Sequence, residues 1–267
     1  MRWNEMTAPE FKEAVTMSKG VCLLPLGVME KHGNHLPVGI DYMKAWHYAD
    51  MAATREPAIV FPPFYAGSIS GAKHCPGTFA LPTPLIYEFL DETCREIARN
   101  GLKKIILVNA HGGNQSWLAN FLRMQLDSKR DYMVYLCSHD FGAKTEKAKA
   151  ELKQRTGDFG GHGSSYETAV ALYLFPKLVK MDKILPPENG RPLQRLKSLD
   201  EYAVKTPMAW YSKHPEHIAG YGGETTNTDG EKICKAITED LCEIIRRVKS
   251  DNVSMELYHE FFQQTEH

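Results

Sequence analysis

Short apolar runs alternate along this chain with longer amphipathic segments, and this alternation limits the possible folds more than any other feature. Four runs are short enough to be buried strands, at residues 21–24, 58–61, 103–108 and 132–137. Residue patterns predict helices at 8–18, 41–54, 85–100, 115–128, 169–175 and 231–250, and a charged helix with a solvated face at 144–155. The run at 103–108 lacks polar alternation, which is typical of a parallel strand covered on both faces. We therefore predict an α/β fold with a mainly parallel sheet.

Length and charge narrow the class of partner. The 267 residues suffice for one large α/β domain or two small ones, and we expect a single domain over residues 1–267. The 32 basic and 33 acidic residues are interspersed and leave a net charge of -1. A basic footprint for nucleic acid and a polybasic stretch for an anionic membrane are both missing. A small-molecule substrate is the expectation, with no nucleic acid and no membrane as partner.

Cysteine usage and the N-terminal residues favour a cytoplasmic location. The six cysteines are scattered without a C-x-x-C pair, as reduced thiols usually are. Residues 1–5 lack an apolar signal core, and no apolar run reaches the length of about 18 residues that a membrane span needs. We expect a cytoplasmic protein.

The Gly- and Pro-rich loop at 25–41 carries acids and histidines in a pattern that suits a metal. In an extended segment, side chains two residues apart point the same way, so Glu30 and His32 can aim at one point. A turn at Pro37 and Gly39 can bring Asp41 close to these two side chains. Imidazole and carboxylate together are ligands for Zn, Mn, Fe or Ni. One Glu-x-His alone is weak evidence, but two further Gly-rich loops with histidine follow downstream.

Those two loops supply further candidates. His111 follows the apolar run at 103–108, and ligands of open α/β sheets bind at the carboxyl ends of strands. The glycines after it lack the Lys and Ser/Thr of a phosphate-binding P-loop. His162 lies in a Gly-rich turn, and Glu167 follows it at the start of an apolar helix. A first-turn Glu often serves only the helix dipole, so Glu167 alone would be weak evidence.

Taken together, these motifs resemble the creatininase (creatinine amidohydrolase) family of metal-dependent amidohydrolases. The matching stretches are Glu30-Lys31-His32-Gly33-Asn34-His35-Leu36-Pro37 with Asp41, His74-Cys75-Pro76-Gly77-Thr78, Val108-Asn109-Ala110-His111-Gly112-Gly113-Asn114 and His162-Gly163-Ser164-Ser165-Tyr166-Glu167-Thr168. They follow the family's order over about residues 10 to 175, with weaker echoes at 220–223 and 229–230. The resemblance implies a three-layer sandwich with a mainly parallel central sheet flanked by helices. It also implies a homo-oligomer, which in the family is a hexamer.

The resemblance further implies a binuclear metal centre with five protein ligands. These are Glu30, His32, Asp41, His111 and Glu167, with Asp41 as the bridge. Glu30 and His111 would hold one ion, and His32 and Glu167 the other. Five ligands with three carboxylates are too many for one tetrahedral Zn²⁺, but they suit two ions about 3.5–4 Å apart. We expect two divalent ions, Zn²⁺ first, with Mn²⁺ or Fe²⁺ as alternatives.

The reaction expected from such a centre is hydrolysis of a C–N amide bond by a metal-activated water. His162, titrating near neutrality beside the metals, is the candidate that moves a proton to the departing nitrogen. Ser68, His74 and Trp210 are candidates for binding the substrate, a small-molecule amide.

Two departures from creatininase itself bear on the substrate. Gly113 stands where creatininase has a Glu, which moves the carboxylate to Glu167, and Phe159 and Gly161 stand where it has acids. They argue against creatinine and leave a cyclic amide, a formamide or a peptide-like amide.

Two other functions fit the same loops: a mononuclear metal lyase or isomerase, and a non-catalytic metal- or ligand-binding module. Three histidine features are set aside as structural. His47 lies on a predicted helix, His139 precedes Asp140 in a pair, and the motif His214-Pro215-Glu216-His217 cannot present two helical ligands. The role of residues 183–223 stays open.

Overall fold

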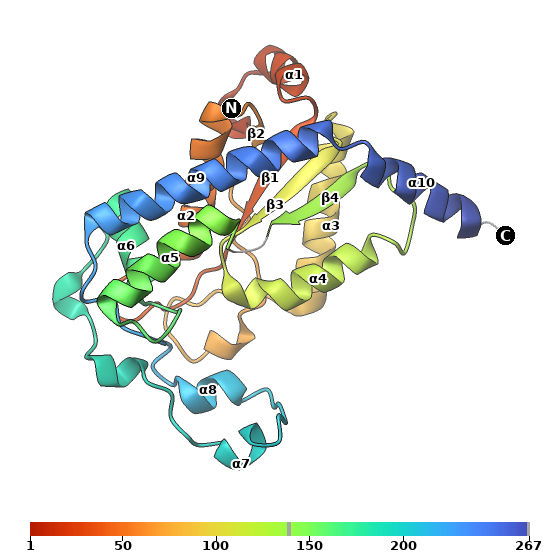
Figure 1. Ribbon diagram of the computed structural model, residues 1–267. Coiled ribbons are helices and arrows are strands. Elements are labelled where there is room, and N and C mark those ends of the chain that lie inside the picture. The colour runs from red at the N-terminus through yellow and green to blue at the C-terminus, as the bar shows by residue number, and fades with distance from the viewer. Residues whose placement is uncertain (138–139, 266–267) are drawn as a thin grey trace.

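The structure is a computed structural model that describes residues 1–137 and 140–265. Four strands form one parallel sheet in the order β2-β1-β3-β4 (Figure 1), which confirms the predicted parallel sheet. They are β1 (Val21–Leu26), β2 (Ile59–Val60), β3 (Lys104–Asn109) and β4 (Met133–Cys137). The second strand is shorter than predicted, because two prolines without an N–H group follow Phe61.

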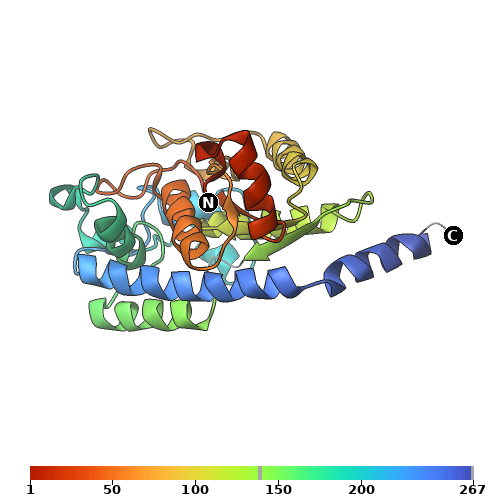
Figure 2. The same cartoon turned by 90° about the horizontal axis from the view of Figure 1, so that it is seen from above.

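Helices cover both faces of the sheet, which confirms the three-layer sandwich (Figures 1 and 2). Helices α2 (Ile40–Arg55), α5 (Ala143–Thr156), α6 (Ser165–Leu174) and α9 (Asn227–Ser250) share one core, and α1 (Ala8–Met17), α3 (Thr83–Arg99) and α4 (Gln115–Met124) share the other. Successive side chains of a strand point to opposite faces. Leu23 and Ile106 therefore enter the first core, whereas Leu24 and Leu107 enter the second.

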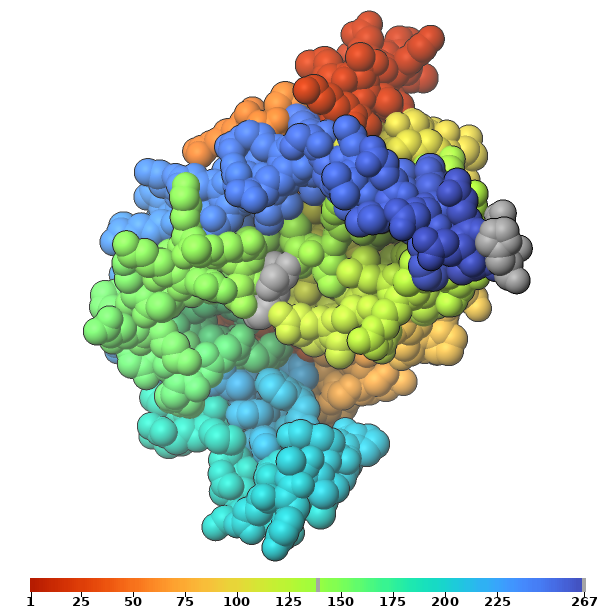
Figure 3. Space-filling view, turned by 45° about the vertical axis from the view of Figure 1, so that its right-hand side comes forward, coloured from red at the N-terminus to blue at the C-terminus, as the bar shows by residue number. Residues whose placement is uncertain are grey.

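The remaining elements are short or peripheral. They are α7 (Lys197–Asp200), α8 (Ala209–Lys213), α10 (Val253–Thr265) and five 3₁₀ turns at Trp3–Glu5, Ser70–Ala72, Gly112–Asn114, Met181–Lys183 and Pro187–Gly190. The segment around α7 and α8 bulges from the surface (Figure 3), and α10 projects beyond the sheet (Figure 2). Among the described residues, no helix has both the length and the apolar character that crossing a membrane requires.

Helices α6 and α9 each begin four residues earlier than predicted, and their starts have local causes. The carboxylate of Asp158 accepts hydrogen bonds from the amide and the hydroxyl of Ser165, at 3.0 and 2.6 Å, and so satisfies the start of α6. As a result Glu167 lies in the first turn of that helix. Helix α9 begins at Asn227 because Thr226 and Asp229 form a capping box.

Gly27 lets the end of β1 pass directly against the start of α2. A Cβ atom at this position would lie 2.2 Å from the amide nitrogen of Tyr42 and 2.4 Å from the carbonyl carbon of Asp41. Both of these are backbone atoms, which cannot rotate away as a side chain can. The close approach brings Asp41 beside the loop that carries Glu30 and His32.

Replacing Gly27 by Ala should therefore lower the free energy of unfolding by about 1–3 kcal/mol, the usual cost of overpacking. Chemical denaturation of the metal-free protein measures this change. Gly71→Ala is the matched control, because a Cβ at Gly71 would meet no atom within 4 Å. Equal stability of the two variants would contradict the close approach.

Candidate metal centre

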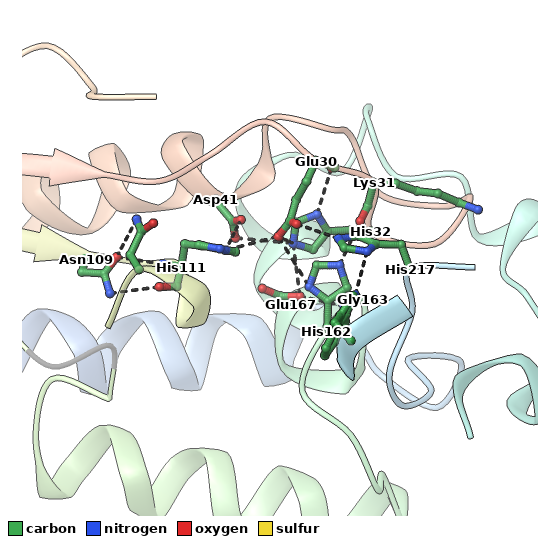
Figure 4. A network of polar contacts seen from close by, with 12 residues as sticks. Glu30, Lys31, His32, Asp41, Asn109, His111, His162, Gly163, Glu167 and His217 are labelled. Atoms are coloured by element: carbon green, nitrogen blue, oxygen red, sulfur yellow. Dashed lines mark hydrogen bonds and ion pairs between the residues drawn. The ribbon is translucent and has the colours of Figure 1, made fainter. Parts of the chain in front are cut away.

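The five side chains named as candidate ligands lie together at the carboxyl ends of the strands (Figure 4). Glu30 and His32 come from the loop after β1, and His111 comes from the loop after β3, just beyond Ala110. Asp41 and Glu167 come from the first turns of α2 and α6. All five are buried, and none is more than 7% exposed.

They form two groups of three that share Asp41. In the first ligand group (Glu30, Asp41 and His111), His111 Nδ1 lies 3.2 Å from Glu30 Oε1 and 3.0 Å from Asp41 Oδ2. In the second ligand group (His32, Asp41 and Glu167), His32 Nε2 lies 3.4 Å from Asp41 Oδ1 and 3.5 Å from Glu167 Oε2. Asp41 therefore offers one oxygen to each group.

His111 Nδ1 and Asp41 Oδ2 are hydrogen-bonded at 3.0 Å, but other atoms of the two groups lack such a partner among the described residues. Glu30 Oε1, His32 Nε2 and Asp41 Oδ1 are buried, and none of them has a well-aligned hydrogen-bond partner among the described residues. Asp41 Oδ1 has the ammonium of Lys44 only 2.7 Å away, but as an ion pair without that alignment. Buried polar atoms rarely stay unsatisfied, so the arrangement fits a pair of divalent cations.

The ring of His32 is oriented for this purpose. Its Nδ1 lies 3.2 Å from the carbonyl oxygen of Glu30, which can only accept a hydrogen bond. Nδ1 therefore carries the proton, and in the neutral ring Nε2 presents its lone pair to Asp41 and Glu167. A backbone contact that sets the tautomer in this way is usual for histidines that bind metals.

The same carboxylates make both imidazoles basic when no metal is bound. Burial lowers the pKa of His32, but Glu167 and Asp41 outweigh it and hold that pKa well above its usual value. Burial also acts against the charged form of His111, and Glu30 and Asp41 overcome it and raise the pKa of His111 to about 9. Both rings are therefore protonated at pH 7 in the metal-free protein.

Metal binding at pH 7 should consequently release about two protons per chain, because a cation displaces them from His32 and His111. The release should fall as the pH rises through about 9, where His111 has already lost its proton. Isothermal titration calorimetry in two buffers of different ionisation enthalpy measures the release. A titration at pH 7 that releases no protons would contradict the raised pKa values.

The carboxylate of Glu167 is held from two sides. The amide of Gly163 donates to Glu167 Oε2 at 2.7 Å, and Lys44 Nζ donates to Oε1. Gly163 has a φ of +62°, a conformation that glycine adopts without steric cost. The contact of Lys44 with Glu167 was not predicted from the sequence, because a lysine on a helix is usually exposed to solvent.

His162 lies against the second group in a defined tautomer. Its Nε2–H donates to the carbonyl oxygen of Lys31 at 2.9 Å, so Nδ1 is free to accept, 3.6 Å from Glu30 Oε1. The ring lies 4.1 Å from that of His32, centroid to centroid. Burial and the neighbouring His32 lower the pKa of His162 to about 4. The ring is therefore neutral at pH 7 and does not titrate near neutrality as expected.

His217 is a site residue that the sequence analysis set aside. Trp210 Nε1–H donates to His217 Nδ1 at 2.8 Å, and His217 Nε2 lies 2.7 Å from Glu30 Oε2. Because an indole can only donate, the proton of His217 sits on Nε2 and points at Glu30. The backbone of His217 has a φ of +53°, a strained value for a residue with a side chain. The motif His214-Pro215-Glu216-His217 could have indicated this role. It lies in the loop after Lys213 and brings His217 to the site without a helix.

A cavity of about 430 Å³ opens beside these residues. Glu30, His111, His162 and Glu167 border it on one side, and Ser68, Ile69, Trp210 and Ala219 are among the residues that line the rest. Of the three expected substrate-binding residues, Ser68 and Trp210 thus lie at the cavity.

His74 and His47 do not line this cavity. His74 Nε2 lies 2.9 Å from the carbonyl oxygen of Pro215. His47 packs against Phe175, as a structural residue would. His139 lies outside the described residues.

Comparisons with known proteins agree with this geometry. A family model described as creatininase, creatinine amidohydrolase, matches residues 4–245. A creatinine amidohydrolase from Pseudomonas putida is 28% identical over 71% of this chain and 78% of its own length. A mycofactocin precursor peptide peptidase from Mycobacterium ulcerans is 27% identical over 84% of each chain.

Solved structures show the same fold. One, described as creatininase Mn, has a TM-score of 0.76 at 24% identity and covers 94% of this chain and 99% of its own. Another similar structure is a creatininase variant described as Zn–Zn type. The family model spans most of the chain, and the fold matches over nearly its full length. The chain belongs to the creatininase family.

Proposed function

We propose that this protein is a metal-dependent amidohydrolase that cleaves a C–N amide bond with two bound divalent cations. The observation that carries the proposal is the pair of three-residue ligand groups that share Asp41. The names of the relatives support the reaction class, since both a creatinine amidohydrolase and a peptide peptidase cleave C–N bonds. Zn²⁺ is the first choice of ion, with Mn²⁺ or Fe²⁺ as alternatives. The Mn and Zn–Zn descriptions of creatininase structures support the choice of Zn²⁺ and Mn²⁺.

In the proposed assignment, Glu30 and His111 would hold one ion, His32 and Glu167 would hold the other, and Asp41 would contribute to both. When bound, such a pair supplies a Lewis acid for a carbonyl oxygen and lowers the pKa of a water. The residues of this chain hold that centre in shape. His217 donates a hydrogen bond to Glu30 Oε2. Glu30 Oε1 has no hydrogen-bond partner among the described residues and is the oxygen proposed as a ligand in the first group.

His162 is the proposed group for moving the proton. It borders the cavity, it is neutral at pH 7, and its free Nδ1 faces the same region as Glu30 Oε1. A neutral imidazole with a free acceptor nitrogen can take up a proton and return it to a departing nitrogen. The hydrogen bond to Lys31 holds the ring in this tautomer.

The cavity favours a small amide substrate. Its volume of about 430 Å³ suits a small molecule or the end of a peptide. Glycines and apolar residues line most of it, and the residues that line it include no Lys or Arg. We propose a cyclic amide, a formamide or a peptide-like amide, with Trp210 as a flat apolar wall.

We also propose a homo-oligomer. On α10, Val253, Leu257 and Phe261 recur every four residues and are 59%, 58% and 43% exposed. A stripe of this kind on a projecting helix suits contact with another copy of the chain. The hexamer implied by the family resemblance stays a prediction.

The test combines metal analysis with an activity screen. Protein purified without chelator should carry up to two divalent ions per chain and hydrolyse at least one member of a panel of cyclic amides, formamides and short peptides. His162→Ala should keep the metal and lose turnover, whereas the control His47→Ala should keep both. One ion that saturates the protein would favour the mononuclear lyase or isomerase. Two ions without any turnover would favour the binding module.

A further inference from the structure

A buried lysine lies beside the metal centre and has no part in the function proposed above. Lys44 is 1% exposed and lies one turn after Asp41 on α2. Its Nζ lies 2.7 Å from Asp41 Oδ1 and donates a hydrogen bond to Glu167 Oε1. On the other side, the ring of Tyr166 lies with its centroid 5.6 Å from Nζ. A lysine is rarely buried so completely unless its charge is matched by such partners.

The ammonium of Lys44 contacts two carboxylates of the second ligand group but only the shared Asp41 of the first. Both of its carboxylate partners, Asp41 Oδ1 and Glu167, belong to the second ligand group. The first group uses Asp41 Oδ2, and Glu30 and His111 form no ion pair with Lys44. A cation at the second group would share two carboxylates with a fixed positive charge, and at such short range in a buried site like charges repel strongly.

We propose that Lys44 makes the two cation positions unequal. The first ligand group holds its ion firmly, and the second group binds its ion more weakly and exchanges it. This inference rests on the proposed function, because it presumes that the two groups bind cations. Lys44 is thus a positioning residue: it holds Asp41 and Glu167 in place and sets the affinity of the second position.

The test is a titration of the metal-free protein with Mn²⁺ alone, with free Mn²⁺ followed by electron paramagnetic resonance. The wild-type protein should bind one Mn²⁺ at least about tenfold more tightly than a second. Lys44→Met keeps the length and apolar stem of the side chain but removes the charge. It should tighten the second equivalent by about tenfold or more and change the first one less.

A matched control is Lys104→Met. Lys104 is partly buried, and its Nζ donates to the carbonyl oxygens of Val248 and Lys249, away from the site. Its loss should leave both Mn²⁺ affinities unchanged. If Lys104→Met shifts the two Mn²⁺ affinities as Lys44→Met does, the shift results from the change in the net charge of the protein, and the proposal is wrong.

Two further variants keep the proposal testable if Lys44→Met does not fold. His32→Ala should remove the weak equivalent and spare the tight one, and His111→Ala should remove the tight one. Two equal equivalents in the wild-type protein, the opposite assignment of the two histidines, or an unchanged gap in Lys44→Met would each overturn the inference and leave the proposed function standing. Failure to bind any Mn²⁺, Zn²⁺ or Fe²⁺ would overturn both.

Discussion

Replacing Asp41 by Asn is expected to remove cation binding from both ligand groups and to abolish hydrolysis. Asp41 gives Oδ2 to the first group and Oδ1 to the second, and an amide has only one oxygen and no charge. Turnover should fall well beyond the roughly 10- to 100-fold loss that is typical when a supporting residue of a metal site is changed. Metal analysis and steady-state kinetics on the same preparation measure the two effects.

The variant should also lose stability in its metal-free form. Lys44 would lose one of its two carboxylate partners while staying buried, at a cost of roughly 1–3 kcal/mol. Asp50→Asn is the matched control, because Asp50 lies on the same helix and pairs with Arg2 at 3.0 Å, away from the site. That control should keep metal and activity. Two bound ions in Asp41→Asn would be incompatible with a bridging carboxylate.

The second large effect is expected for Glu167→Gln. This change keeps the shape of the side chain but removes the only carboxylate that belongs to the second ligand group alone. The variant should keep one tightly bound ion, lose the other and lose turnover by about 100-fold or more. Titration with Mn²⁺ and a rate measurement at saturating Mn²⁺ provide the two readouts.

The control for Glu167 tests the alternative that a first-turn acid serves only the helix dipole. Glu146 lies in the first turn of α5 just as Glu167 lies in the first turn of α6. Glu146→Gln should cost a few tenths of a kcal/mol up to about 1 kcal/mol of stability and should not affect metal content or turnover. If Glu167→Gln behaves in the same way, Glu167 is a helix-dipole residue and the second ligand group does not exist.

The parts of this molecule that could be predicted are those encoded by local patterns. Apart from Asn109 at the end of β3, the strands β1 and β3 are apolar at every buried position, so their place in the middle of a sheet follows from the sequence. Glu30, His32 and His111 follow directly after these strands, and parallel strands bring such residues to one edge of the sheet. Asp41 was predicted from the Pro/Gly turn after His32, whereas Glu167 was added through the family resemblance. Each lies in the first turn of a helix that starts at that edge.

The parts that could not be predicted depend on contacts between distant segments. Lys44 is 123 residues from Glu167, and only the packing of α6 against α2 brings its ammonium to that carboxylate. His217 reaches Glu30 from 187 residues away through a loop with no periodicity. The pKa of His162 is low because of burial and the nearby ring of His32, and neither is visible in the motif itself.

The claim on which the account depends is that two cations lie on either side of Asp41. Anomalous diffraction from crystals of the protein in excess Mn²⁺ tests it most directly. We expect two anomalous peaks about 3.5–4 Å apart, one among Glu30, Asp41 and His111 and the other among His32, Asp41 and Glu167. A single peak, or peaks that do not touch Asp41, would contradict the binuclear centre.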